Sequence, residues 1–291
     1  MAPVIFSVAS TPGVSLTAYR WDPAGEPRGI VQITHGMGEH LLRYESLAEA
    51  LSGAGFVAVG QDQRGHGATA QDGRLGDLGD GGWDELVRDI GRVSEQVRAE
   101  LPGLPLVLLG HSMGSFAAQQ WALDHSDELA GLVLTGTAAL DLLEPAMDLD
   151  QPMELSAFNA PFEPGRTDYD WLSRDEAQVD AYVADPRCGF GLAGDGTKEL
   201  FVAARQMADP DRLASIRKDL PVYVAVGEND PVGGQLALVR ALVQRLEGAG
   251  LTDVTLIVYP GARHEVFNET NRDEVVGDLV RWLDRVVPPA A

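Results

Sequence analysis

Short apolar segments alternate with helical patterns along most of the chain, and this alternation constrains the fold more than any other feature. Eight segments are predicted as strands: Pro3–Ala9, Val14–Trp21, Gly29–Thr34, Phe56–Gln61, Pro105–Gly110, Gly131–Thr135, Pro221–Gly227 and Val254–Tyr259. The helical patterns are His40–Gly53, Trp83–Leu101, Ser112–His125, Gln235–Glu247 and Asn271–Val287. This order predicts an α/β fold with a mostly parallel eight-stranded sheet, helices on both faces and an antiparallel hairpin of the first two strands at one edge. Ligands are then expected at the carboxyl ends of the strands.

One interval breaks the alternation. Residues 138–220 contain no strong strand pattern but many aspartates, prolines and aromatic residues. The interval is too long for a loop within a compact domain, and its aromatic residues argue against a disordered linker. We therefore expect a mostly helical cap at 138–220, inserted between the sixth and seventh strands of a core formed by 1–137 and 221–291.

The transition from strand to helix at residues 106–120 is the first candidate for chemistry. Four consecutive apolar residues precede Gly-His-Ser112-Met-Gly, and helical spacing follows. A strand that becomes a helix within about four residues needs a sharp turn, and Gly110 and Gly114 remove side chains that would collide there. The Gly-x-Ser-x-Gly pattern is typical of a nucleophile elbow, which raises the serine hydroxyl above the sheet. The alternative is that Ser112 only caps the helix.

A serine hydroxyl becomes a good nucleophile when a histidine, itself oriented by a carboxylate, takes its proton. In hydrolases with this turn, the three residues follow the order Ser, Asp or Glu, His along the chain. Only His125 and His264 follow Ser112. His125 lies several turns along the helix that begins at Ser112, so it cannot face the hydroxyl. His264 follows the last predicted strand and is therefore the predicted base.

The acid is expected at the end of another strand on the same edge. Asp230 lies in the turn after the strand at 221–227, and Pro231 fixes the backbone just beyond it. Glu228 is a competitor two residues earlier. We favour Asp230, because Glu228 lies nearer the strand end, where its longer side chain could serve the cap or a helix terminus instead.

The negative charge on a reacting carbonyl oxygen needs backbone N–H donors. One donor is predicted at Met113, directly after the serine. The other is predicted at Met37 in "ITHGMGEH", because Gly36 and Gly38 let the backbone approach closely there. His35 and His40, with His66 and His111, could suggest a metal site, but no cysteine or carboxylate spacing resembles a zinc pattern, and we expect no metal.

Composition excludes several classes of partner. The 291-residue chain has 44 acidic and 22 basic residues and a formal net charge of −22, which argues against binding to nucleic acid or an anionic membrane. No apolar stretch approaches the roughly 18 residues that a membrane span needs. The N-terminus lacks Lys and Arg, unlike a secretory signal, and the single Cys188 excludes an internal disulfide. We therefore expect a cytoplasmic protein, and nothing in the sequence indicates its oligomeric state.

The motifs "HGMGEHLLRY", "DQRGHG", "GHSMGS", "ENDPVGG" and "YPGARHEVFNE" occur in this order. Together they resemble the monoacylglycerol lipase and lysophospholipase branch of the α/β-hydrolase family, and the resemblance extends from about Gly29 to Val287. It implies the following roles: Ser112 as nucleophile, Asp230 as acid, His264 as base, and the Met37 and Met113 amides as oxyanion donors. The first part of the cap, about 145–162, matches the family least well, so the size of the substrate stays open.

These residues predict a serine carboxylic ester hydrolase that cleaves monoacylglycerol-like or other small lipid esters through an acyl-enzyme, without a cofactor. Some apolar residues of the cap are expected to line an acyl tunnel; the candidates are Leu140, Leu142, Leu143, Met147, Leu149, Met153, Leu155, Phe158 and Phe162. Alternatives with the same triad are a short-chain esterase, a lactonase or an aminopeptidase. An aminopeptidase would need acidic residues in the cap, such as Glu154, Glu163 or Asp170, to hold the substrate amine. A non-catalytic binding module is disfavoured, because it has no need of His264.

Overall fold

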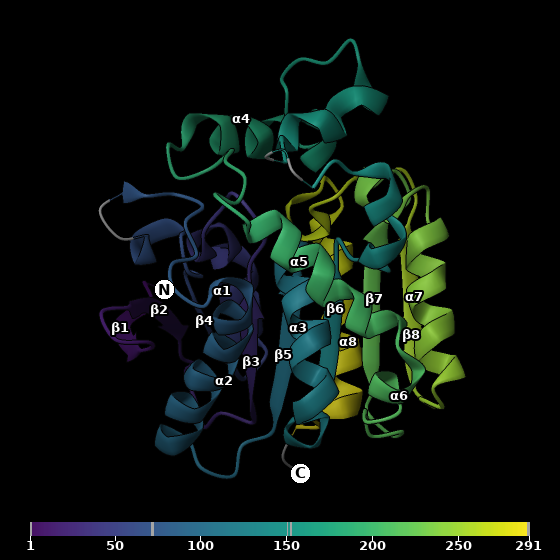
Figure 1. Cartoon of the computed structure of the whole chain (residues 1–291). Coiled ribbons are helices and arrows are strands. Elements are labelled where there is room, and N and C mark those ends of the chain that lie inside the picture. Colours follow the sequence, from purple (N-terminus) through teal and green to yellow (C-terminus); the bar gives the residue numbers. More distant parts are fainter. Residues whose placement is uncertain (1, 71–72, 150, 152, 290–291) are drawn as a thin grey trace.

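A computed structural model describes residues 2–70, 73–149, 151 and 153–289 of the chain. Its centre is one sheet in the order β1-β2-β4-β3-β5-β6-β7-β8 (Figure 1). The strands are β1 Val4–Ala9, β2 Ser15–Trp21, β3 Gly29–Thr34, β4 Phe56–Gln61, β5 Leu106–His111, β6 Gly131–Thr135, β7 Val222–Gly227 and β8 Val254–Tyr259. β2 pairs antiparallel with both of its neighbours, β1 and β4. All other neighbouring strands of the sheet, from β4 to β8, are parallel. The predicted fold class is therefore confirmed.

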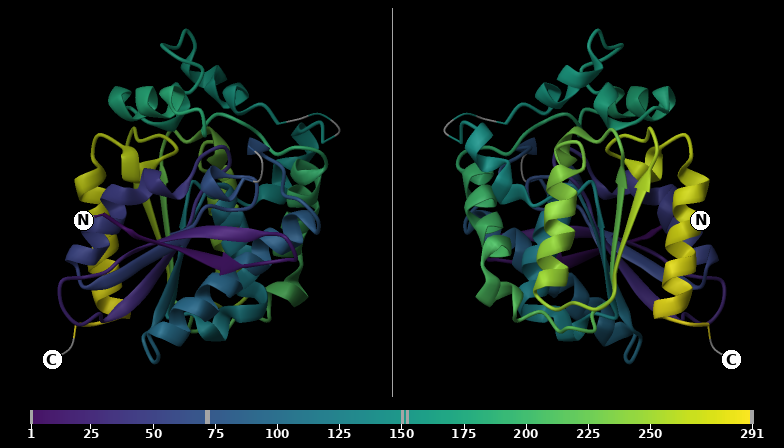
Figure 2. Two further views of the ribbon diagram at one scale, coloured as in Figure 1. Left: turned by 90° about the vertical axis from the view of Figure 1, so that its left-hand side faces the viewer. Right: turned by 90° about the vertical axis from the view of Figure 1, so that its right-hand side faces the viewer.

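Helices cover both faces of the sheet, which is why its central strands can be apolar on both sides. The helices are α1 Glu45–Gly53, α2 Gly82–Glu100, α3 Met113–His125, α4 Glu176–Ala184, α5 Gly196–Ala204, α6 Pro210–Leu213, α7 Ala237–Gly248 and α8 Arg272–Val286. α1 and α8 share one buried apolar cluster, whereas α2, α3, α5 and α7 share the other. Figure 2 shows the two layers edge-on, with α8 in yellow on one side of the sheet. No helix in the described part of the chain is long and apolar enough to cross a bilayer.

The segment between β6 and β7 is helical, as predicted, but it consists of short pieces. It holds 3₁₀ segments at Leu140–Leu142, Glu144–Ala146, Leu155–Phe162, Asp170–Leu172 and Arg205–Ala208 beside α4, α5 and α6. The part around α4 lies over the carboxyl ends of the strands (Figures 1 and 2). By contrast, α5 packs against α2 and α3 on the face of the core. The division of the chain at residues 138 and 220 therefore stays a prediction, and the part that covers the strands ends before α5.

Candidate active site

The turn between β5 and α3 holds Ser112 in a strained conformation. Its φ of 51° and ψ of −123° lie in a region that residues other than glycine rarely adopt. Such a backbone conformation costs about 1–3 kcal/mol of strain. A Cβ on Gly110 would lie 2.5 Å from the Gly114 carbonyl oxygen, and one on Gly114 would lie 2.2 Å from that of Thr34. Both glycines are therefore required by the close approach of α3 to the ends of β3 and β5. The turn places Ser112 on the wall of a cavity beneath the cap.

Asp230 and His264 come from the loops after β7 and β8 and meet on the same side of this cavity. His264 Nδ1 lies 2.9 Å and 3.0 Å from the two carboxylate oxygens of Asp230, and both residues are 2% exposed. Asp230 Oδ1 also accepts a hydrogen bond from the Val232 amide at 2.9 Å, which fixes the carboxylate. Ser112 and His264 both line the cavity. The structure thus brings together Ser112, His264 and Asp230.

Glu228, the competing acid, lies elsewhere. Its side chain is exposed and accepts a hydrogen bond from the Gly261 amide at 2.9 Å. It therefore holds the turn after β8, while the carboxylate next to His264 is that of Asp230.

His264 lies in a dry, negatively charged environment. Burial alone would lower the pKa of its imidazole, but Asp230, with smaller effects from Glu265 and Glu39, outweighs burial and raises this pKa above its usual value. The ring packs against those of Trp171 and His111, with centroid separations of 4.8 Å and 4.7 Å. The His264 amide also donates to the Trp171 carbonyl at 3.3 Å. The cap therefore fixes both the backbone and the ring of the predicted base.

The loop His35–His40, which we call the oxyanion loop, passes directly beside Ser112. A Cβ on Gly36 would lie 3.2 Å from Cβ of Ser112. The Gly36 amide donates to Oε1 of Glu39 at 2.6 Å, which fixes the first half of the loop. Met37 and Met113 both line the cavity, and Met113 begins α3, where the amide has no acceptor within the helix. The residues of the two predicted oxyanion donors therefore line the same cavity as Ser112.

A buried ion network underlies the site and was not predicted from the sequence. Arg43 Nη1 donates to Oε2 of Glu39 at 2.8 Å, and Arg43 Nη2 donates to Oε2 of Glu265 at 2.7 Å. These three side chains are 10%, 3% and 5% exposed. Glu39 also accepts from the Tyr44 hydroxyl at 2.7 Å. The network ties the oxyanion loop to Glu265, the residue that follows His264.

The cavity beneath the cap is lined mostly by apolar side chains. Five of the apolar cap residues singled out in the sequence line it: Leu140, Leu143, Met153, Leu155 and Phe158. Leu142, Met147, Leu149 and Phe162 are absent from its wall, and Leu142 is 46% exposed. Phe116, Trp171, Leu172, Leu200 and Val232 complete the apolar lining. Such a wall suits a hydrocarbon chain that ends near Ser112.

The acidic cap residues considered for an amine-binding site do not line the cavity. Glu154, Glu163 and Asp170 are not among its lining residues, and the first two are exposed. Glu163 accepts from the Gly165 amide and Asp170 from the Thr167 hydroxyl. Of the described residues, the carboxylates that do line the cavity are Glu39 and Glu265, and both are paired with Arg43.

The other histidines have structural partners. His35 Nδ1 bonds to the Gly36 carbonyl and His66 Nδ1 to that of Arg64, and burial lowers the pKa of both rings to about 3. Burial also lowers the pKa of His111 to about 4, and its Nδ1 lies 3.0 Å from the Thr135 hydroxyl. His125 lies near the far end of α3, half-buried and paired with Glu128.

Comparison with known proteins finds similarity to serine hydrolases, lipases and esterases over most of the chain. Residues 25–271 match a family model described as serine aminopeptidase, S33. The chain is 33% identical to a monoacylglycerol lipase of Mycolicibacterium smegmatis over 283 residues, 95% of each chain. It is 29% identical to human monoglyceride lipase, over 91% of this chain and 85% of that one. A thermostable carboxyl esterase from Bacillus coagulans, solved with glycerol, is 31% identical, with a TM-score of 0.86 and 99% of both chains covered.

The ion network gives the first testable prediction. Replacing Arg43 by Met leaves Glu39 and Glu265 buried without a cation, which should lower the free energy of unfolding by about 3–5 kcal/mol near neutral pH. Burial and mutual repulsion then raise the pKa of these carboxyls in the folded variant. Part of the lost stability should therefore return as the pH falls from about 8 to about 5, because one carboxyl takes up a proton. Chemical denaturation across this pH range measures the effect.

In the wild type, Glu265 changes the stability with pH in the opposite direction. Burial alone would raise the pKa of Glu265, but Arg43 outweighs it and lowers this pKa, so the stability that Glu265 contributes is lost only in acid, below its ordinary pKa. The control is Arg285→Met, which removes the exposed ion pair with Asp253 and should change stability by less than about 1 kcal/mol. A loss in Arg43→Met no larger than in this control would contradict the network.

Proposed function

Since the chain belongs to the α/β-hydrolase family described as serine aminopeptidase S33, and within it to the monoacylglycerol lipase branch, we propose that it is a serine ester hydrolase whose substrates are monoacylglycerols or similar small lipid esters. The observation that carries this proposal is the buried bond between His264 and Asp230 beside Ser112, on the wall of a mostly apolar cavity. The acyl chain lies along the apolar wall, and the ester carbonyl lies at Ser112. The cytoplasmic location and the use of lysophospholipids stay predictions.

The proposed reaction begins with attack of the Ser112 Oγ on the ester carbonyl carbon. The Asp230 carboxylate accepts the Nδ1–H of His264, which leaves Nε2 to take the proton from the serine hydroxyl. The carbonyl oxygen becomes an oxyanion, which the amides of Met37 and Met113 stabilise.

The ester C–O bond then breaks, and the proton on His264 passes to the leaving alcohol. A water molecule, activated by the same histidine, next attacks the acyl-enzyme carbonyl. The Ser112 hydroxyl is restored when the acyl–Oγ bond breaks and the carboxylic acid leaves. Every step of the cycle uses side chains and amides of this chain.

The lining of the cavity favours an ester over a peptide substrate. The cap carboxylates considered for binding an amine do not line the cavity, and the two carboxylates on its wall are neutralised in part by Arg43. Most of the remaining wall is apolar, which suits a hydrocarbon chain better than a charged N-terminus.

The nucleophile is tested by covalent labelling. A fluorophosphonate should react with the wild-type protein at Ser112, because the elbow exposes its hydroxyl to the cavity and His264 takes its proton. The variant Ser112→Ala should show no labelling and no esterase activity, with an unchanged circular dichroism spectrum. The control Ser46→Ala, at an exposed position of α1, should label like the wild type. Labelling that persists in Ser112→Ala would overturn the assignment.

The base and the acid are tested together by the pH profile of kcat/KM. Activity should fall in acid along a single ionisation, because protonated His264 cannot accept the serine proton. The midpoint should lie above the ordinary histidine value of about 6.5, since Asp230 raises the pKa of His264. Asp230→Asn should reduce kcat by about 10³–10⁴-fold and move the remaining midpoint to lower pH, because burial then dominates.

Glu228→Gln is the matched control and should leave the profile close to that of the wild type. A flat profile down to about pH 5 would contradict the role of His264. A large loss in Glu228→Gln, with Asp230→Asn nearly normal, would reverse the assignment of the acid.

The apolar wall predicts how activity depends on the acyl chain. Burying a methylene group contributes at most about 0.8 kcal/mol, so kcat/KM for glycerol monoesters should rise several-fold for each added pair of carbons until the cavity is full. A panel of glycerol monoesters, aryl esters and aminoacyl amides measures this dependence. If activity peaks on acetyl or propionyl esters, the lipid substrate is wrong and a short-chain esterase or lactonase is the better description.

A further inference from the structure

A short stretch of the cap lies directly on the oxyanion loop. We call residues 182–191, from the end of α4 to the following loop, the cap strap. The Gly189 amide of the strap donates to the Gly38 carbonyl of the loop at 3.0 Å. Gly38 has a φ of +63°, and a Cβ there would lie 2.4 Å from the Phe190 carbonyl oxygen. The backbones of the strap and the loop are therefore in close contact, one residue beyond Met37.

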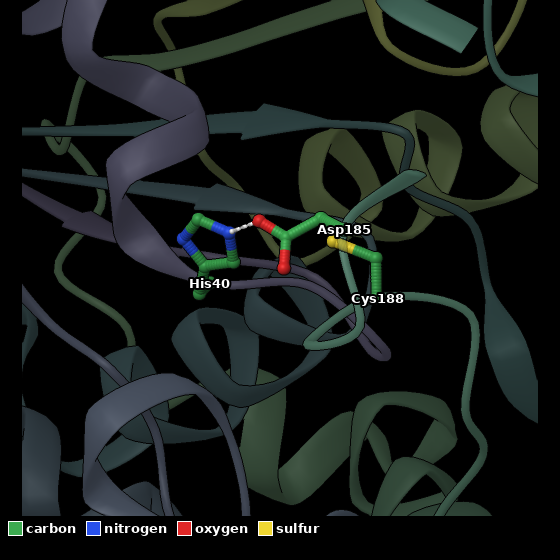
Figure 3. Close-up of side chains that lie close together, drawn as sticks. All are labelled: His40, Asp185 and Cys188. Carbon is green, nitrogen blue, oxygen red and sulfur yellow. Dashed lines mark hydrogen bonds and ion pairs between the residues drawn. The ribbon is translucent and has the colours of Figure 1, made fainter. Parts of the chain in front are cut away.

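A partly buried side-chain pair joins the same two segments. His40 Nε2 lies 2.9 Å from Oδ2 of Asp185, and the two side chains are 5% and 22% exposed (Figure 3). Arg187 holds the carboxylate from the other side through contacts of 3.1 Å and 2.8 Å. Arg187, with a smaller contribution from His40, keeps the pKa of Asp185 well below its usual value. Asp185 is therefore a fixed anion, and it holds the last residue of the oxyanion loop.

Cys188 completes the cluster in Figure 3, which has the residue types of a metal site. Two features favour a hydrogen-bonded pair of Asp185 and His40 instead. Both Asp185 oxygens already accept hydrogen bonds from Arg187, and burial raises the pKa of the Cys188 thiol to about 12, so that the thiolate ligand is scarce at neutral pH. The contacts of Asp185 are thus accounted for by Arg187 and His40.

We propose that the Asp185–His40 pair is a positioning latch that holds the Met37 amide in place for the oxyanion. This inference rests on the proposed function. The oxyanion loop contains two glycines, Gly36 and Gly38, so its backbone needs outside contacts to keep one conformation. Glu39 holds the first half through the Gly36 amide, and the strap holds the second half through Gly38 and His40. Asp185 and His40 lie outside the wall of the cavity, so they act through the loop and not by touching substrate.

The competing explanation is that the pair only attaches the cap to the core. An ion pair elsewhere in the cap provides the matched control, since Arg272 of α8 lies 2.7 Å from Asp175 at the start of α4. The side chains of Asp175 and Asp185 are both 22% exposed. Each also accepts a hydrogen bond from the amide two residues later, Ala177 and Arg187, which an asparagine could still do. Each of the substitutions Asp175→Asn and Asp185→Asn therefore removes one attachment of the cap. Of the two aspartates, only Asp185 contacts the oxyanion loop.

The experiment compares the two variants in the full-length protein. It measures kcat and KM for a glycerol monoester, and the affinity for an alkyl trifluoromethyl ketone, which forms a tetrahedral oxyanion on Ser112. The corresponding secondary alcohol, which forms no oxyanion, serves as the comparison ligand. Asp185→Asn should lower kcat by about 10- to 100-fold with little change in KM. It should also lower the affinity for the ketone by a similar factor and leave the affinity for the alcohol unchanged. Asp175→Asn should stay within about two-fold of the wild type in all four measurements.

A second pair of variants keeps the test decisive if Asp185→Asn does not fold. His40→Leu removes the donor to Asp185 and should lose kcat and ketone affinity, whereas His40→Gln retains an N–H donor and should restore part of both. Equal losses in Asp185→Asn and Asp175→Asn, or equal weakening of ketone and alcohol, would overturn the latch. If the wild type neither hydrolyses esters nor forms an adduct on Ser112, the proposed function fails and the latch with it. An active wild type whose Asp185→Asn and His40→Leu variants behave normally overturns the latch alone.

Discussion

The contact between the first turn of α3 and the end of β3 is the constraint on which the site depends. With no side chain at Gly114, the helix backbone packs directly on the carbonyl oxygen of Thr34. This close approach forces the strained turn at Ser112 and puts the oxyanion loop, which begins one residue after Thr34, beside the serine. The parallel sheet behind them is buried on both faces, so it can support the local strain. Backbone packing thus places Ser112 and the oxyanion loop, which hold the proposed nucleophile and the proposed Met37 donor.

A second set of contacts places His264, the proposed base. Asp230 fixes the ring of His264, Trp171 fixes its backbone amide, and Arg43 joins the following Glu265 to Glu39 of the oxyanion loop. The loops after β3, β7 and β8 and the cap are therefore connected by buried polar bonds. Such bonds are strong in a low-dielectric site, but each depends on all its partners being present. The cap is consequently part of the catalytic geometry in this proposal, and not only a cover over the substrate.

The sequence predicted the core closely and the cap poorly, for physical reasons. Buried parallel strands are continuous apolar runs bounded by glycine or proline, so β3 to β8 were found within one residue of their observed ends. The antiparallel strands β1 and β2 were found equally closely. The helix expected from His40 begins as a 3₁₀ turn at Leu41–Tyr44, because the loop before it is held by tertiary contacts. The cap consists of short segments without a clear period. Pairs such as Arg43 with Glu265 and His40 with Asp185 are 222 and 145 residues apart, so only the fold reveals them.

The buried trio of Glu39, Arg43 and Glu265 has a further consequence for turnover. Two carboxylates and one guanidinium leave a single net negative charge beside the cavity. This charge favours the imidazolium form of His264 while the ester is being cleaved. A neutral ester, however, becomes a carboxylate when the acyl-enzyme is hydrolysed, and the same charge then repels the product. The surface beyond, with a formal net charge of −22 for the whole chain, extends this repulsion outward. In the proposed reaction, the negative charge at the site therefore attracts the carboxylate product less than the neutral ester.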